Sequence, residues 1–166
     1  MTSSHHILQT RIDTPLGPLL AARSRQGLSG LWFDGQRHHP GELSAPHGDD
    51  ALFDRLAAAI RSYFSGAEFA PALLQDLDPA GTAFQREVWR ALLAIPAGNT
   101  LSYGALAAEL GRPSAVRAVG AAVGRNPISI VIPCHRVLGA DGGLTGYAGG
   151  LPRKQALLTL EGARFH

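Results

Sequence analysis

The only cysteine of this 166-residue chain lies in the segment Ile130-Val131-Ile132-Pro133-Cys134-His135-Arg136-Val137. A β-branched run closed by proline is typical of a buried, extended segment that ends where Cys134 begins. A free thiol is only roughly a few per cent ionised at neutral pH, so a nucleophilic cysteine needs a neighbouring base or positive charge. His135 and Arg136 offer one of each, which predicts a reactive thiol. The alternative is an inert core cysteine, which residue type alone would favour.

Two short helices are predicted ahead of this segment. Ser102 can cap a helix over 103–110 that stops at Gly111-Arg112-Pro113, and Ser114 can cap a second one over 115–123. Two short helices joined by a turn that contains glycine favour a helix-turn-helix, and the alternative is a plain αα-hairpin.

The second of these helices carries one long side chain, Arg117, in its first turn. Its other residues are mostly small, which lets its backbone approach another surface closely. The small residues are Ala115, Ala118, Gly120, Ala121 and Ala122. This composition predicts a binding partner that the helix approaches through a narrow opening.

The first part of the chain predicts a small sheet followed by a helix. Short apolar runs separated by turn residues favour three strands that form a meander. Asp50 can cap the helix, and Gly66 ends it. The predicted strands are 7–12, 18–22 and 28–33, the helix is 50–65, and 70–77 is an edge strand or an extended connector.

A boundary at Asp78-Pro79-Ala80-Gly81 predicts two domains, 1–80 and 81–166. Thr82 and Gln85 form a capping box for the next helix. Near the other end of the chain, the loop 139–150 holds six glycines, and Pro152 begins a last helix that Gly162 ends. Glu161 stands at the end of that helix, where a carboxylate opposes the helix dipole, so its position needs another reason.

Composition and charge restrict the class of protein. The chain has no apolar run of about 18 residues and no signal-peptide pattern, so we expect no membrane partner. A single cysteine forms no internal disulfide, which favours a reducing, cytoplasmic location. Residues 1–80 hold six Arg and nine acids, for a net charge of −3, and residues 81–166 hold nine basic and four acidic residues, for +5. The basic half is where a polyanion would bind. His38, His39 and His47 lack further ligands at metal-site spacing, so no metal is expected.

The signature Pro133-Cys134-His135-Arg136-Val137 resembles the acceptor-cysteine signature of the O6-alkylguanine-DNA alkyltransferases. Five more segments between Gly81 and Gly162 match in the family's order and spacing, and the resemblance is faint over 1–80. They are Leu101-Ser102-Tyr103, Ala115-Val116-Arg117-Ala118-Val119-Gly120, Arg125-Asn126-Pro127, Gly146-Tyr147-Ala148-Gly149-Gly150 and Leu160-Glu161-Gly162. The expected fold is α+β: a ribonuclease-H-like N-terminal lobe with a three-stranded sheet and a helix, then a mostly helical, winged-helix-like lobe.

The resemblance implies DNA repair by direct reversal. Cys134 would accept the alkyl group of O6-alkylguanine, and of O4-alkylthymine, once and irreversibly. His135 would act as the base through a water, and Glu161 would hold its imidazole. Tyr103 would donate its hydroxyl to the guanine ring, and Asn126 would tie the second helix to the cysteine segment. These roles make the protein a single-turnover methyltransferase that needs no cofactor.

The same resemblance implies a minor-groove complex with double-stranded DNA, formed by a protein that is a monomer in its free state. Arg117 would enter the base stack as the alkylated guanine is flipped out. The other implied DNA-binding residues are Ser114, Ala115, Ala118 and Ala121, and the implied pocket residues are Val137, Tyr147, Ala148 and Gly149. Some members carry serine where Ala148 stands, so the preference between methyl and bulkier groups stays open. The cysteines with which some relatives bind zinc are absent.

Three other functions are alternatives for this sequence. An alkyltransferase-like protein that flips lesions without reacting would lack Cys134. A thiol hydrolase would need an oxyanion hole, and no residue pattern identifies one. A transcription factor would need several long polar side chains on its recognition helix, where residues 115–123 offer only Arg117.

Overall fold

The computed structural model describes residues 5–166, which form two compact units. The first unit runs up to Ala80 and also contains Pro127–Val131, and the second consists of Gly81–Asn126 and Ile132–His166. Residues 127–131, which the sequence assigns to the C-terminal domain, group with the first unit by their contacts. The segment joins the first unit because the Leu31 amide donates to the Pro127 carbonyl at 2.8 Å, and the Ser129 amide donates to the Leu31 carbonyl at 2.9 Å.

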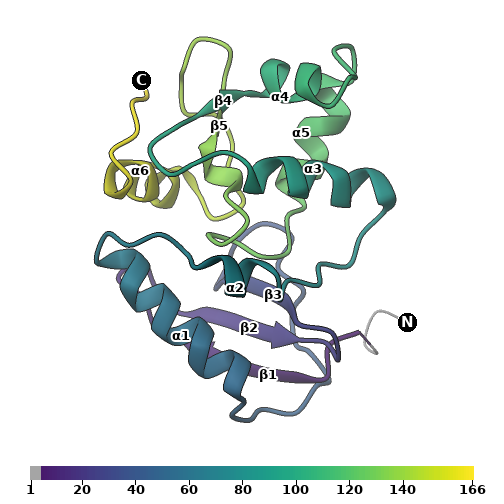
Figure 1. Ribbon diagram of the computed structural model, residues 1–166, viewed down its shortest axis with the longest axis vertical. Helices are drawn as coiled ribbons and strands as arrows, with labels where there is room; N and C mark the ends of the chain where they lie inside the picture. Colours follow the sequence, from purple (N-terminus) through teal and green to yellow (C-terminus); the bar gives the residue numbers. More distant parts are fainter. Residues whose placement is uncertain (1–4) are drawn as a thin grey trace. The chain divides into compact units, whose positions relative to one another are not determined.

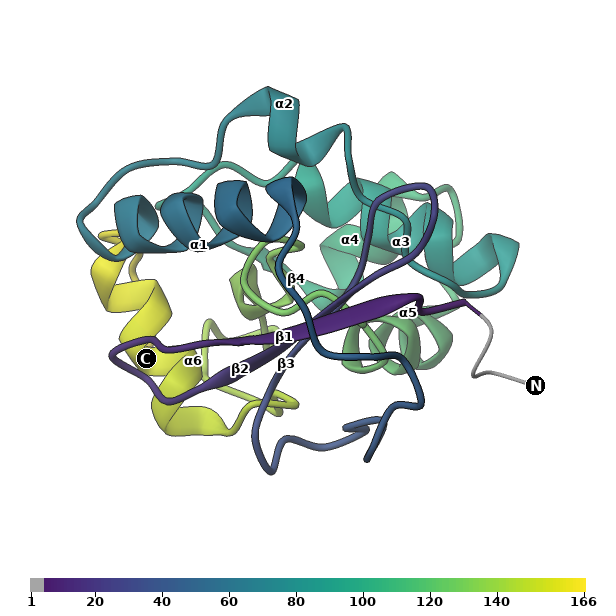
Figure 2. The same cartoon turned by 90° about the horizontal axis from the view of Figure 1, so that it is seen from below.

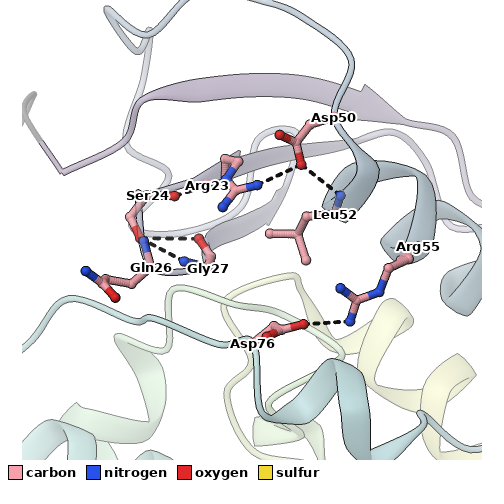
Figure 3. Close-up of polar contacts among 8 residues, drawn as sticks. All are labelled: Arg23, Ser24, Gln26, Gly27, Asp50, Leu52, Arg55 and Asp76. Atoms are coloured by element: carbon pink, nitrogen blue, oxygen red, sulfur yellow. Dashed lines mark hydrogen bonds and ion pairs between the residues drawn. The ribbon is translucent and has the colours of Figure 1, made fainter.

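The first unit contains the predicted three-stranded meander. Its strands β1 (Leu8–Ile12), β2 (Leu19–Arg23) and β3 (Leu28–Phe33) pair antiparallel in that order (Figure 1). In the turn between β2 and β3, the Ser24 hydroxyl accepts from the Gln26 and Gly27 amides at 3.0 and 3.2 Å (Figure 3). Gly27 is required there, because a Cβ atom would lie 2.1 Å from the Asp76 carbonyl oxygen.

Helix α1 (Ala51–Phe64) lies against one face of this sheet (Figures 1 and 2). Apolar residues at helical spacing form its buried side, as the sequence predicted. These residues are Leu52, Phe53, Leu56, Ile60 and Tyr63. The expectation of an edge strand or connector at 70–77 is wrong in part, because Pro71–Leu74 forms the short helix α2 with proline in its first turn. Only Leu77 adds an isolated bridge, to Leu28.

The second unit is mostly helical. Thr82 and Gln85 form the predicted capping box at the start of α3 (Ala83–Leu93). The indole of Trp89 on α3 donates to the Ala122 carbonyl at 2.9 Å, which joins α3 to α5. The remaining elements are β4 (Leu101–Ser102), α4 (Tyr103–Glu109), α5 (Val116–Gly124), the 3₁₀ helix η2 (Cys134–Arg136), β5 (Val137–Leu138) and α6 (Leu151–Leu160), with β4 and β5 paired in parallel.

Two local expectations, one at the start of α5 and one in the segment before Cys134, are wrong. Helix α5 begins at Val116, and its N-cap is Ala115 without a side-chain hydrogen bond, so Ser114 does not cap it. The segment before Cys134 is buried but not extended. Ile130 has a φ of 72°, and Cys134–Arg136 forms a 3₁₀ turn. The apolar residue types predicted the burial of this segment correctly. The extended conformation predicted for the same residues is wrong, because the surrounding fold outweighs the strand preference of Ile and Val. Over residues 5–166, no helix combines the length and apolarity needed to cross a membrane.

Asp50 provides a test of how α1 is held. Its carboxylate accepts from the Leu52 amide at 2.7 Å and from the Arg23 guanidinium at 2.7 Å (Figure 3). Partial burial would raise the Asp50 pKa, but the hydrogen bonds from Leu52 and Arg23 outweigh it, so the pKa lies below its ordinary value. Asp50 therefore stabilises the fold above that ordinary value, and the contribution is lost as pH falls through the folded-state pKa.

We expect Asp50→Ala to lower the free energy of unfolding by about 1 kcal/mol at neutral pH, measured by urea denaturation. Asp50→Asn keeps an N-cap acceptor and loses only the ion pair, so it should lose less than Asp50→Ala. Equal losses in the two variants would show that the ion pair, and not the cap, holds the helix end.

Candidate active site

The Cys134 thiol is buried at the start of η2, where the residue is 5% exposed. The backbone before it is held by one carbonyl. The Ile132 oxygen accepts from the Cys134 amide at 2.8 Å and from the Asn126 side-chain amide at 2.8 Å. Asn126 directly follows the α5 C-cap, so this bond ties the end of α5 to the cysteine segment.

The electrostatic surroundings keep this thiol protonated at rest. Burial raises the Cys134 pKa, while a hydrogen bond with the Asn126 side chain and the positive charge of Lys154 act in the opposite direction without overcoming it. Because the thiolate is the nucleophilic form, the site needs a base that takes the proton when a substrate is present.

His135 has the environment of such a base. Its ring is fully buried, and Nε2 lies 2.8 Å from the Glu161 carboxylate. Burial lowers the His135 pKa more than Glu161 raises it, so the imidazole is neutral at pH 7. A carboxylate can only accept, which assigns the proton of the neutral ring to Nε2. The other nitrogen, Nδ1, is buried and has no hydrogen-bond partner among residues 5–166, which leaves it as an acceptor.

Glu161 also binds Arg136, and this explains a carboxylate at the end of α6. The Arg136 guanidinium donates to both Glu161 oxygens, at 2.8 and 2.9 Å, and to the Ile95 carbonyl at 2.6 Å. The sequence had offered Arg136 as a positive charge for the thiol. That expectation is corrected, because the guanidinium is directed to the Glu161 carboxylate, and the cation that acts on Cys134 is Lys154.

Lys154 is the residue that sequence reasoning missed. It is 0% exposed, and its ammonium donates to the carbonyls of Val137, Thr145 and Gly146 at 2.6, 2.8 and 3.2 Å. All three ammonium protons thereby have acceptors, which links α6 to β5 and to the glycine-rich loop. A signal was available: the only lysine of the chain stands three residues before Leu157, on the apolar side of α6.

Tyr103 and Tyr147 lie at the edge of this group. Tyr103 is the first residue of α4, its hydroxyl interacts with the Thr145 side chain, and burial raises its pKa. Gly120 of α5 lies beside the Tyr103 ring, since a Cβ there would be 3.7 Å from Cδ1. The Tyr147 ring lies edge-on to the His135 ring, with 6.5 Å between centroids. Of the other expected pocket residues, Val137 and Gly149 are buried, and Ala148 is half-buried.

The expected DNA-binding residues share one side of α5. Arg117, Ala118 and Ala121 are exposed at helical spacing, with Ser114 exposed just before the helix and Ala115 half-buried. The opposite side is buried, and it consists of Val119, Ala122 and Val123. The exposed side therefore presents small residues and one arginine, while Asn126, Cys134, His135 and Glu161 form a separate buried group. Within residues 5–166, no three His, Cys, Asp or Glu side chains come together as a metal site.

Comparison with known protein families gives the class of protein. Residues 83–163 match the DNA-binding domain of 6-O-methylguanine DNA methyltransferase, and residues 7–73 match the ribonuclease-like domain of the same protein. The chain belongs to the 6-O-methylguanine DNA methyltransferase family. This confirms the family that Pro133–Val137 indicated, and it confirms the α+β fold with a ribonuclease-like first part.

Individual relatives match along almost the whole chain. A methylated-DNA–protein-cysteine methyltransferase of Salmonella typhimurium is 47% identical, over 94% of this chain and 96% of that protein. A protein of the same name from Mycobacterium bovis is 47% identical, over 92% of this chain and 91% of its own length. The crystal structure of Mycobacterium tuberculosis OGT in complex with DNA has a TM-score of 0.83 at 45% identity, and covers 94% of this chain and 93% of that one.

The burial of Lys154 generates a direct prediction. Desolvation lowers its pKa from 10.5 to about 8, and the nearby Cys134 raises it only in part. Because the chain has one lysine, NMR of protein labelled with ¹³C-lysine gives a single side-chain signal. We expect this signal to titrate near pH 8 in the folded protein and near pH ~10.4 in denaturant.

The consequence for stability has a definite sign. Between these two pH values the unfolded chain holds the lysine proton and the folded chain does not, so the Lys154 contribution to the free energy of unfolding rises with pH. A Lys154→Met protein should lack this rise. A lysine signal that titrates near pH ~10.4 in the folded protein would contradict the buried, desolvated ammonium.

Proposed function

We propose that this protein repairs DNA by transferring alkyl groups from O6-alkylguanine to Cys134. The observation that carries the proposal is the buried thiol beside a neutral His135, whose imidazole is held by Glu161. Membership of the methyltransferase family supports the same chemistry, since its curated relatives are named methylated-DNA–protein-cysteine methyltransferases. The presence of Cys134 also argues against the alternative of an alkyltransferase-like protein, which binds DNA lesions without reacting with them.

In the first step, His135 takes the thiol proton through a water molecule. Nδ1 is the nitrogen that accepts, because Nε2 donates to Glu161. The imidazolium that forms is stabilised by the Glu161 carboxylate, and Arg136 keeps that carboxylate ionised and in place. This division of roles parallels the nucleophile, base and orienting acid of hydrolytic triads.

In the second step, the thiolate attacks the alkyl carbon. The S–C bond forms as the C–O bond breaks, and the electron pair goes to the guanine. The Tyr103 hydroxyl donates to a guanine ring nitrogen, which lets the base leave closer to neutral. Val137, Tyr147, Ala148 and Gly149 form the walls of the pocket, with the carbonyls near Cys134 and Val137 facing the guanine amino group. A thioether is a poor leaving group, so each protein molecule reacts once.

DNA binding uses the exposed side of α5 in the minor groove. Its small residues, Ala118 and Ala121 among them, allow close approach, and Arg117 fills the place of the extruded base. Extrusion costs a few kcal/mol, so a side chain that occupies the gap lowers the barrier to repair. The same pocket would accept O4-alkylthymine. The protein acts as a monomer in the cytoplasm, where its thiol stays reduced.

The stoichiometry of transfer tests the central claim. Mixed with an excess of duplex DNA that contains O6-methylguanine, the protein should gain one methyl group per chain, located on Cys134 by peptide mass spectrometry. Cys134→Ser should gain none and still bind DNA, because the thiol attacks and makes no binding contact. Repeated turnover, or methylation at another residue, would contradict the proposal.

The role of Arg117 is tested by comparing two substrates. In duplex DNA, Arg117→Ala should slow transfer by about tenfold or more, which corresponds to an activation free energy higher by at least about 1.4 kcal/mol. In a single strand that contains O6-methylguanine no base pair is broken, so the same variant should react at close to the normal rate. Arg61→Ala, which removes an exposed arginine from α1, serves as the charge-matched control. Equal losses on both substrates would place Arg117 in the chemical step.

A further inference from the structure

One residue of the first unit, Ile130, has an unusual backbone conformation four residues before Cys134. Ile130 is fully buried, yet its φ is 72°, a region that β-branched residues rarely adopt. The Val131 amide donates to the Ser129 carbonyl at 2.8 Å, which closes a three-residue γ-turn of the strained kind around Ile130. Such a conformation persists only when the surrounding structure holds it.

The contacts that hold this turn come from β3 and from Gln36. Leu31 of β3 exchanges two backbone hydrogen bonds with Pro127 and Ser129. The Ser129 hydroxyl donates to the Gln36 side-chain oxygen at 3.1 Å, and the same oxygen accepts from the Phe33 amide at 2.8 Å. Gln36 is 6% exposed and Ser129 is 2% exposed, so water does not replace this bond if it is removed.

The next anchor along the chain is the Ile132 carbonyl, which Asn126 binds. Between Ser129 and Ile132 only Ile130 and Val131 intervene, so a change of φ at Ile130 would displace the backbone that presents the thiol. A displacement of about 1 Å can slow an enzymatic reaction by about a hundredfold.

We propose that the buried Ser129–Gln36 hydrogen bond keeps the turn at Ile130 in its strained form, and thereby positions Cys134 for attack on the alkyl carbon. Gln36 and Ser129 are positioning residues, and they act through the chain and not by touching the substrate. The inference rests on the proposed transfer of alkyl groups to Cys134.

The test compares two serine variants of the first unit. Ser129→Ala removes the hydroxyl bonded to Gln36, and Ser29→Ala is the matched control, since Ser29 is also buried and its hydroxyl bonds His6 at 2.7 Å. Single-turnover transfer is followed over a range of concentrations of O6-methylguanine duplex, together with the thermal unfolding midpoint. Ser129→Ala should lower the limiting rate by about fivefold or more, which corresponds to the free energy of one buried hydrogen bond. It should leave the half-saturating DNA concentration unchanged.

Ser29→Ala should keep the wild-type rate, even if both variants unfold at similarly reduced temperatures. A second pair covers the case in which Ser129→Ala is too unstable to assay: Gln36→Glu keeps the acceptor oxygen and should retain most of the rate, whereas Gln36→Met should not. The double variant Gln36→Met/Ser129→Ala should be no slower than Gln36→Met alone.

Equal limiting rates in Ser129→Ala, Ser29→Ala and the wild type would overturn the positioning role, as would equal rates in Gln36→Glu and Gln36→Met. Failure of the wild-type protein to accept any methyl group would instead refute the proposed function. The two failures are therefore distinguishable in one set of assays.

Discussion

The Glu161 carboxylate is shared between His135 and Arg136, and the arrangement of the candidate site depends on this contact. Its side chain is 2% exposed, so the charge is stable only because both oxygens have donors. The contact joins the end of α6 to η2. It also sets the proton of His135 on Nε2 and holds the Arg136 guanidinium on the carboxylate. A helix C-terminus disfavours a carboxylate, and two buried partners outweigh that cost.

The surroundings of the Cys134 thiol keep it protonated in the absence of a substrate. Burial raises the Cys134 pKa, and the ammonium of Lys154 offsets only part of that effect. A permanently ionised thiol would be open to oxidation, since susceptibility follows thiolate character and exposure. In this protein the Cys134 thiol is buried and protonated, beside the neutral His135 imidazole. On the proposed mechanism, its reactivity depends on geometry at the moment of transfer more than on a lowered resting pKa.

Lys154 and Gln36 serve the same purpose in different units, because each uses buried polar groups to fix irregular backbone. Lys154 collects three carbonyls from β5 and the glycine-rich loop. Gln36 holds Phe33 and Ser129 together. Irregular segments have few backbone hydrogen bonds of their own, and a buried carbonyl or amide without a partner is costly. Side chains that satisfy these groups therefore fix the path of the irregular segments that they bind.

The sequence alone predicted the features that depend on neighbouring residues: the three-strand meander, the Asp50 cap of α1, the Thr82–Gln85 capping box and the paired helices α4 and α5. It also singled out Cys134 and, by family resemblance, paired His135 with Glu161, which the structure brings into contact at 2.8 Å. Only the tertiary structure placed Lys154 on the Val137 carbonyl, 17 residues away, and Ser129 on Gln36, 93 residues away. The same limit explains the errors at Ile130 and Arg136. Periodicity and capping act over a few residues, whereas a buried polar side chain is placed by whichever distant groups the fold brings beside it.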